Sequence, residues 1–213
     1  MECSTMLSSV FCKEKEMEIY LIRHGETEYN VERRYQGSRD ISLSETGKAK
    51  LRKAEFETDT VYVTPMCRTA QTAEILFPNA RQIPVFELRE MNFGVFEGKN
   101  HEELKSDPIY QAWVESEWMT LCPQGETRDE FSKRTCRALG ELIDRGLEQE
   151  KQKLVIVAHG GTQMAALEHF CQPKRGYAAW LTGNGGGYVL STEAWKSDRM
   201  LSVLREVNYG EKG

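Results

Sequence analysis

Two short apolar runs that end in the same way constrain the fold of this chain most. Residues 19–22 read Ile-Tyr-Leu-Ile and lead into Arg23-His24-Gly25, while residues 154–158 read Leu-Val-Ile-Val-Ala and lead into His159-Gly160-Gly161. A continuous apolar run of this length is typical of a strand that is buried on both faces. Helix-compatible segments separate the predicted strands, which indicates βαβ units. We therefore predict an α/β fold, a three-layer α/β/α sandwich with a mostly parallel central sheet and a small helical cap insertion.

The pattern of apolar and turn residues predicts the order of the elements. Ser44, followed by charged residues, is typical of a helix start, and Pro84 inside an apolar run indicates an edge strand. The long polar stretch at about 89–128 is predicted to form the cap, with Trp113 and Trp118 packing inside it. We predict strands at 17–22, 60–64, within 81–88 and at 153–160, a closing hairpin at 186–195 and 199–207, and helices at 44–56, 67–77, 127–147 and 161–171.

Length, charge and cysteine content limit the class of protein. A chain of 213 residues suits a single domain, and its net charge of -5 counts against a nucleic-acid binder. No apolar stretch approaches the roughly 20 residues of a membrane span. The six cysteines show no C-x-x-C spacing, which counts against a zinc site and favours a reducing, cytoplasmic compartment. We expect residues 1–16 to be a disordered tail before one domain at 17–213, with Met1 and Met17 both candidate starts and no indication of an oligomeric state.

Cationic side chains follow three of the predicted strands. Arg23 and His24 follow the first strand, Arg68 lies at the start of the helix after the second, and His159 and Gly160 lie at the end of the strand at 153–160. Ligands of parallel sheets bind beyond the carboxyl ends of the strands, and a helix N-terminus favours anions. A lone histidine is usually structural, and a His-Gly pair is often only a tight turn. Because two of the four histidines end apolar strands in the same way, we predict a phosphate site here.

Five segments, in this order, resemble the histidine phosphatase superfamily, which includes the cofactor-dependent phosphoglycerate mutases. They are LIRHGETEYN, RRYQGSRDISLSETG, VTPMCRTAQTAEIL, LREMNFGVFEG and IVAHGGT, and the resemblance extends along nearly the whole chain from Met17. One departure is Thr64, which stands where the family usually has serine before its arginine-bearing helix. The resemblance implies that residues 17–213 form a histidine phosphatase domain.

The resemblance also implies roles for individual residues. His24 would attack phosphorus with a neutral imidazole nitrogen, and the charges of Arg23 and Arg68 would disfavour its protonated form. Arg23, Arg68 and His159 would meet the phosphoryl oxygens without a metal or another cofactor. The implied catalytic residues are His24, Glu90 and His159, and the implied substrate-binding residues are Arg23, Asn30, Gln36, Gly37, Arg68 and Gly160. Glu90 would be the general acid, with Glu87 and Glu97 as alternatives.

The loop around Glu90 favours the phosphatase branch of the family. The chain has EMNFG where the mutases carry an Arg-x-Tyr-Gly pattern, and its cap is short. Together with PQGETRDEF, this loop is similar to that of α-ribazole phosphatases, so the resemblance implies hydrolysis of a small phosphorylated metabolite such as α-ribazole 5′-phosphate. Two alternatives stay open. One is a 2,3-bisphosphoglycerate-dependent phosphoglycerate mutase, and the other is an inactive phospho-ligand binding or regulatory module, which the filled site positions disfavour.

Overall fold

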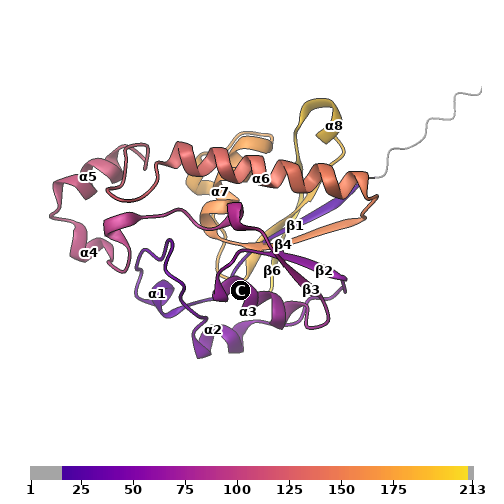
Figure 1. The fold of residues 1–213 in the computed structure, drawn as a ribbon, viewed down its shortest axis with the longest axis horizontal. Coiled ribbons are helices and arrows are strands. Elements are labelled where there is room, and N and C mark those ends of the chain that lie inside the picture. The colour runs from indigo at the N-terminus through magenta and orange to yellow at the C-terminus, as the bar shows by residue number, and fades with distance from the viewer. Residues whose placement is uncertain (1–15, 211–213) are drawn as a thin grey trace, which may run out of the picture.

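A six-stranded sheet forms the centre of the molecule. The computed structural model describes residues 16–210, in which the strands lie in the order β3-β2-β4-β1-β5-β6 (Figure 1). The first four of these neighbours pair in parallel, whereas β5 runs antiparallel to β1 and to β6. The strands are β1 (Glu18–Arg23), β2 (Thr60–Val63), β3 (Arg81–Pro84), β4 (Lys153–Ala158), β5 (Gly186–Ser191) and β6 (Ser202–Asn208). The predicted mostly parallel sheet and the edge strand are confirmed. The two strands of the closing hairpin pair as predicted, but the first ends at Ser191 and the short helix Trp195–Asp198 follows it, so the predicted strand at 192–195 is wrong.

Helices cover both faces of the sheet, which confirms the predicted three layers. In Figure 1, α6 (Arg128–Glu148) and α7 (Gly160–Phe170) lie on one side of the strands, and α2 (Glu45–Lys50) and α3 (Cys67–Leu76) lie on the other. The period of two along β1 explains this arrangement. Ile19 and Leu21 pack in the core beneath α6 and α7, and the alternate residues Tyr20 and Ile22 pack in the core beneath α3.

The long helix α6 begins where the sequence predicts it. Thr127 caps its N-terminus, since the Thr127 hydroxyl accepts from the Glu130 N–H and the Glu130 carboxylate accepts from the Thr127 N–H. Leu139 and Leu142 lie on the buried side of α6 and pack into the core against the sheet. The helix therefore follows from a strong start signal and one apolar stripe.

The helix predicted at 44–56 is shorter than expected. Ser44 caps it as predicted, with its hydroxyl 2.9 Å from the Gly47 N–H, but α2 ends at Lys50. Leu51 takes an extended conformation with ψ of 142° and is buried in the core beneath α3. The next residue, Arg52, donates its backbone N–H to the carbonyl oxygen of Tyr209. Burial of Leu51 and this long-range bond outweigh local helix propensity, so the predicted end of the helix is wrong.

The segment between β3 and α6 lies at one end of the molecule, on the left in Figure 1. It contains α4 (His101–Leu104) and α5 (Pro108–Glu115), whose N-caps are Asn100 and Asp107. Trp113 is completely buried in a separate small core, as predicted for packing within the cap, whereas Trp118 is only partly buried. The remaining short helices are α1 (Glu28–Val31) and α8 (Trp195–Asp198), with 3-10 turns at Phe86–Leu88, Gly94–Phe96 and Tyr177–Trp180.

Two predictions from the sequence concern the N-terminal tail and the absence of a membrane span. The predicted disordered tail falls almost entirely outside the described residues, which begin at Glu16. Within residues 16–210, every helix is too short or too polar to cross a bilayer.

Packing of α6 on the sheet is expected to dominate stability. Leu139 is completely buried, whereas Leu204 on the edge strand β6 is 47% exposed. Leu139→Ala should lower the free energy of unfolding by about 2–5 kcal/mol, because it removes buried methyl groups and leaves a cavity. Leu204→Ala, the same change at an exposed position, should cost about 0.5 kcal/mol or less. Urea titrations measure both free energies of unfolding, provided that the free energy falls with urea concentration at the same slope in both variants. Equal losses of stability in the two variants would contradict this assignment of the core.

Candidate active site

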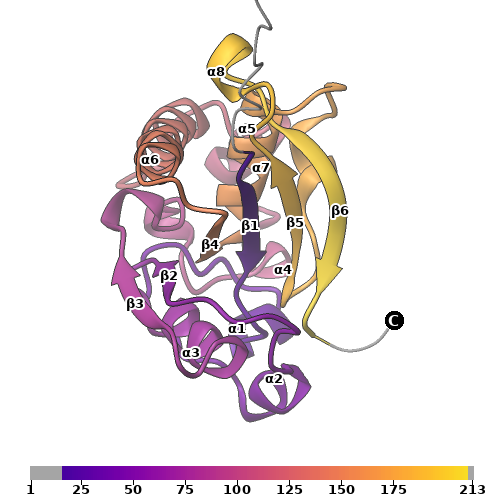
Figure 2. The ribbon, with the colours of Figure 1, turned by 90° about the vertical axis from the view of Figure 1, so that its right-hand side faces the viewer.

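The register between β1 and β4 brings the two predicted histidines together. Arg23 pairs with Ala158, and the next residue, His24, donates its backbone N–H to the Ala158 carbonyl oxygen at 3.0 Å. Figure 2 shows β1 lying between β4 and β5, so both turns leave the middle of the sheet. The rings of His24 and His159 lie with their centroids 5.4 Å apart, and both side chains are buried. Two turns far apart in sequence therefore form one site.

Hydrogen bonding selects one tautomer of His24. Its Nδ1 lies 2.7 Å from the carbonyl oxygen of Gly25. A carbonyl oxygen can only accept, so Nδ1 carries the proton and Nε2 carries the lone pair. Asn184 steadies the same turn, because its side-chain amide donates to the carbonyl oxygens of His24 and Gly25 at 3.2 and 3.3 Å. This arrangement leaves Nε2 of His24 as a neutral, oriented nitrogen.

Arg68 is completely buried and makes its hydrogen bonds to neutral groups. Its Nη groups donate to the carbonyl oxygens of Arg39 and Gly37 at 2.7 and 3.0 Å. Its Nε–H faces Nδ1 of His159 at 3.4 Å, so Nε2–H of His159 donates to the Thr64 hydroxyl at 2.9 Å. These bonds use three of the five N–H groups of the guanidinium and leave two for a ligand.

Burial and neighbouring charge keep both histidines neutral. Burial lowers the pKa of His24 well below the ordinary value of 6.5, and the positive charges of Arg68 and Arg23 lower it further. Burial also lowers the pKa of His159 well below 6.5, with Arg68 again the strongest nearby charge. A neutral imidazole at pH 7 is the form in which a histidine nitrogen can attack an electrophile.

Arg23 supplies a second cation at the same place. Its Nη1 donates to the carbonyl oxygen of Thr182 at 2.6 Å, whereas its buried Nε has no hydrogen-bond partner among the described residues. An unpaired buried donor costs about 1–3 kcal/mol, so an anion that accepts from it is favoured. Gly160 allows this packing, because a Cβ there would lie 2.6 Å from Leu181 and 3.4 Å from the Arg23 Nε.

Glu90 lies at the N-terminus of α7. Its carboxylate accepts from the Met91 N–H at 2.9 Å and from the Gly161 N–H at 3.3 Å. A Cβ on Gly161 would lie 2.1 Å from the carboxylate oxygen, so a larger residue there would displace the Glu90 carboxylate. Gly161 is not among the predicted site residues, although it is the second glycine of the His-Gly-Gly turn.

The two alternative acids lie outside the cavity that Glu90 lines. The carboxylate of Glu97 accepts from the backbone and hydroxyl of Ser38 and from the Phe93 N–H. Glu87 has a side chain that is 43% exposed and pairs with Arg89 at 3.6 Å. Glu97 therefore holds loops together, and Glu87 lies at the surface.

Arg134 of α6 holds the segment that carries Glu90. Its guanidinium donates to the carbonyl oxygens of Glu87, Arg89 and Glu90 at 2.8, 2.9 and 3.0 Å. Arg134 is not among the site residues predicted from the sequence. A signal existed, because Arg134 lies three positions after Phe131 on the otherwise apolar, buried stripe of α6. Three backbone acceptors in one segment explain why a buried stripe contains an arginine.

Arg134 also joins the two ends of the cap. It pairs with the carboxylate of Glu126 at 2.6 Å, and the same carboxylate accepts from the Asn92 N–H at 2.9 Å. The Glu126 N–H in turn donates to the Asn92 carbonyl oxygen at 2.9 Å. We call these three residues, Asn92, Glu126 and Arg134, the cap clasp.

Every predicted site residue except His159 lines one cavity of about 250 Å³. Gly37 contributes a carbonyl oxygen to Arg68 and has φ of +53°, a conformation that favours glycine. The Oδ1 of Asn30 accepts from the Thr27 N–H in the cap of α1, which leaves its NH₂ group for the cavity. The Oε1 of Gln36 is buried without a partner among the described residues. His159 lies behind the ring of His24 and contacts Arg68 and not the cavity.

The donor set does not indicate a metal centre. Within residues 16–210, no three histidine, cysteine, aspartate or glutamate side chains gather as a metal site would require.

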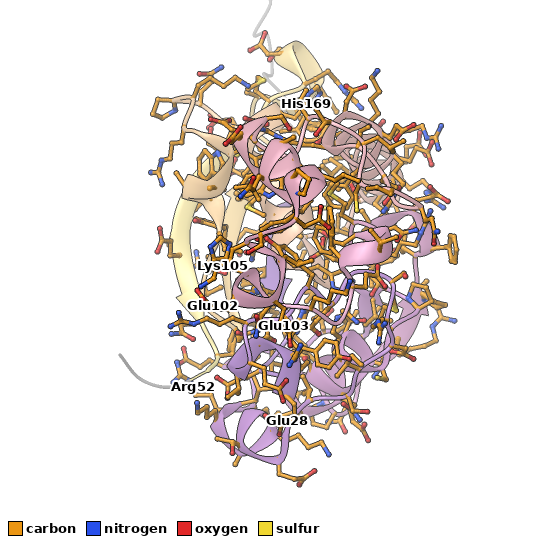
Figure 3. The ribbon with its side chains drawn as sticks, turned by 90° about the vertical axis from the view of Figure 1, so that its left-hand side faces the viewer. Glu28, Arg52, Glu102, Glu103, Lys105 and His169 are labelled. Carbon is orange, nitrogen blue, oxygen red and sulfur yellow. The ribbon has the colours of Figure 1, made fainter. Side chains whose placement is uncertain are left out.

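His169 is exposed near the top of Figure 3, well away from the cap residues Glu102, Glu103 and Lys105 that the figure labels.

Comparison with known sequences and structures identifies one protein family. The family model described as histidine phosphatase superfamily (branch 1) matches residues 19–197. A Hydrogenobacter thermophilus protein provisionally named a phosphoserine phosphatase is 33% identical over 153 residues, which cover 68% of this chain and 73% of that protein. An Escherichia coli protein provisionally named as the phosphoglycerate mutase GpmB is 33% identical over 155 residues, 68% of this chain and 70% of that protein.

Two solved structures extend the similarity to the fold. The α-ribazole phosphatase from Shigella flexneri is similar with a TM-score of 0.75 and 25% identity, over 92% of this chain and 98% of that one. The phosphoglycerate mutase from Thermus thermophilus is similar with a TM-score of 0.65 and 29% identity, over 90% of this chain and 98% of that one. The match over residues 19–197 and the two paired histidine turns lead to one conclusion: the chain belongs to branch 1 of the histidine phosphatase superfamily.

Proposed function

We propose that the chain hydrolyses phosphomonoesters of small metabolites and that the phosphoryl group passes through Nε2 of His24. Membership in the family makes the chain an enzyme of phosphatase or mutase type. The observation that carries the finer proposal is the bond from Nδ1 of His24 to the Gly25 carbonyl oxygen, which leaves Nε2 as the unprotonated nitrogen beside two arginines.

The first half of the reaction transfers the phosphoryl group to the protein. The Nε2 lone pair attacks phosphorus, an N–P bond forms, and the bond from phosphorus to the ester oxygen breaks. Glu90 in its acid form gives its proton to the departing alkoxide. Arg23 and Arg68 stabilise the charge on the equatorial oxygens, the part that a metal ion plays in other phosphoryl transfers. His159 acts through Arg68, whose guanidinium it holds with Nδ1.

The second half releases phosphate. The Glu90 carboxylate takes a proton from water, the oxygen of that water attacks phosphorus, and the N–P bond breaks. Inorganic phosphate leaves, and His24 and Glu90 return to their starting protonation states. This sequence needs no metal and no other cofactor, since the two arginines carry the compensating charge.

Two further aspects belong to this proposal. α-Ribazole 5′-phosphate is a candidate substrate, supported by the similarity to the Shigella flexneri structure.

The four described cysteines, Cys67, Cys122, Cys136 and Cys171, are free thiols, which supports a reducing compartment such as the cytoplasm.

A phosphoglycerate mutase is the second candidate, because similar proteins carry that name. A mutase would return the phosphoryl group to the glycerate and would need 2,3-bisphosphoglycerate for activity. Release of inorganic phosphate without any isomerisation of 3-phosphoglycerate separates the two candidates.

Removal of the nucleophile is expected to abolish hydrolysis. His24→Ala should lower kcat on any phosphomonoester by roughly 10³-fold or more, as removal of a covalent nucleophile does elsewhere. His169→Ala, at an exposed histidine outside the cavity, is the matched control and should leave kcat unchanged. Rapid quenching with ³²P-labelled substrate should trap an acid-labile, base-stable label that His24→Ala lacks. Near-normal turnover by His24→Ala would exclude the mechanism.

Replacement of the acid should matter most for poor leaving groups. An alkyl alkoxide needs a proton, whereas p-nitrophenolate leaves readily without one. In single-turnover experiments, Glu90→Gln should slow phosphorylation by an alkyl phosphate about 10²–10⁴-fold and by p-nitrophenyl phosphate much less. Glu97→Gln is the control, because the Glu97 carboxylate holds loops together and lies outside the cavity. Equal losses with both substrates would show that Glu90 positions the phosphate and does not protonate the leaving group.

The two buried histidines should make stability depend on pH. Their pKa values in the folded chain lie well below 6.5, so below pH 6.5 the unfolded chain binds protons that the folded chain does not. The free energy of unfolding should therefore fall as the pH is lowered from 7 to 5, by about 1.4 kcal/mol per pH unit for each proton taken up on unfolding. His24→Asn should reduce this slope in urea titrations, and an unchanged slope would contradict the assignment.

A further inference from the structure

The cavity changes character away from its phosphate end. Beyond His24 and the arginines, its walls are formed mainly by Tyr35, Phe93, Trp118, Met164 and Tyr177. The rings of Tyr35 and Phe93 lie 5.2 Å apart between centroids, and those of Trp118 and Tyr177 lie 6.0 Å apart. Side chains packed in this way form an apolar wall for whatever group is attached to the phosphate.

Tyr35 turns its ring and not its hydroxyl group to the cavity. Its hydroxyl bonds to the hydroxyl of Tyr110 at 2.9 Å, and Tyr110 is buried in the small core of the cap. The polar atom of Tyr35 is therefore engaged inside the protein, and its aromatic ring faces the cavity.

Three arginines line the cavity, and the third is already paired. Arg23 and Arg68 lie at the phosphate end. Arg34 pairs with the carboxylates of Glu32 and Glu103, the latter at 2.7 Å, and also donates to the Gly98 carbonyl oxygen at 2.7 Å. Figure 3 labels Glu103 on α4, on the face of the molecule that carries the cap. The charge of Arg34 is therefore already offset by two carboxylates, although its Nη2 takes part in none of these bonds.

The size of the cavity sets a further limit. Its volume of about 250 Å³ lies below the roughly 300–1,000 Å³ of sites that hold drug-sized ligands. A phosphate and one ring fill much of such a space, whereas a long or branched polar substrate does not match its apolar wall.

We propose that the preferred substrates are phosphomonoesters whose alcohol carries one compact aromatic or similarly apolar group and no carboxylate. This inference rests on the proposed phosphatase activity and adds the class of alcohol. The aromatic wall would hold the apolar group, and a substrate carboxylate would meet in Arg34 a cation whose charge two carboxylates already offset. Phosphoglycerates and phosphoserine would then be poor substrates.

Three primary alkyl phosphates test the proposal with similar leaving groups. They are 2-phenylethyl phosphate, glycerol 3-phosphate and 3-phosphoglycerate, and the measurement is kcat/KM from phosphate release. Burial of one ring should raise kcat/KM for 2-phenylethyl phosphate roughly ten- to a hundredfold above that for glycerol 3-phosphate. The carboxylate of 3-phosphoglycerate should lower kcat/KM below that for glycerol 3-phosphate.

The outcomes separate the two levels of the proposal. Absence of hydrolysis with all three substrates and with p-nitrophenyl phosphate would defeat the proposed function itself. Hydrolysis in which glycerol 3-phosphate or 3-phosphoglycerate equals or exceeds 2-phenylethyl phosphate would preserve the phosphatase and overturn the substrate class.

A variant of the wall supplies an independent test. Trp118→Ala should lower the ratio of kcat/KM for 2-phenylethyl phosphate to that for glycerol 3-phosphate by about tenfold. Met119→Ala is the matched control, because the neighbouring Met119 is 52% exposed and does not line the cavity. Phe93→Ala repeats the test if Trp118→Ala does not fold. An unchanged ratio in a folded wall variant would overturn the inference.

Release of Arg34 tests the exclusion of carboxylates. The double variant Glu32→Gln/Glu103→Gln removes both anions that hold Arg34. Glutamine at 103 keeps a carbonyl oxygen for the Asn100 N–H, which the Glu103 side chain accepts in the N-cap of α4. The ratio of kcat/KM for 3-phosphoglycerate to that for glycerol 3-phosphate should rise by about tenfold, the effect of one paired charge. An unchanged ratio would show that the paired state of Arg34 does not exclude carboxylates.

Discussion

The parallel pairing of β1 with β4 is the interaction on which the site depends. It sets Arg23 opposite Ala158, and the residue after each strand end is a histidine. A shift of one residue would turn the side chains of one strand to the opposite face and would separate His24 from His159. The register is held by burial on both faces, since alternate residues of β1 pack into two different cores. The chemistry of the site is therefore fixed by the same contacts that stabilise the sheet.

The second condition is a positive charge that no carboxylate cancels by direct contact. Taking an arginine out of water costs several kcal/mol unless hydrogen bonds compensate for it. Arg68 meets that condition with two carbonyl oxygens and a neutral imidazole, all of which lack a full negative charge. Burial, reinforced by the charge of Arg68, lowers the pKa of both His159 and His24 and keeps them neutral. The positive charge of Arg68 is thus available to an anion in the cavity. In contrast, two carboxylates offset the charge of Arg34.

Local signals in the sequence predicted the sheet, the long helices and the cationic side chains Arg23, His24 and Arg68 at one edge of the sheet. The cavity residues Asn30, Gln36, Gly37 and Glu90 followed from the family resemblance. Apolar runs, the Ser44 cap and the two His-Gly turns are features of neighbouring residues, and their consequences are local. Three features depended on distant contacts and could not be predicted in the same way. Leu51 leaves its helix to reach the core, Arg134 reaches three carbonyl oxygens of another loop, and His159 meets Arg68 and not the cavity.

The cap clasp anchors the segment that carries Glu90 independently of the rest of the cap. Asn92 and Glu126 bond to each other by backbone and side chain where the cap begins and ends, and Arg134 fastens both to α6 together with the Glu90 segment. The chain between 93 and 125 is thus a loop closed at its base, and the segment that carries the acid is held from outside it. A fold built in this way lets the residues that face the alcohol change within one segment, provided that Glu97 keeps its bonds to Ser38 beside Gly37, whose carbonyl oxygen holds Arg68. Chimeras that swap residues 93–125 between relatives are the natural unit of redesign for this architecture.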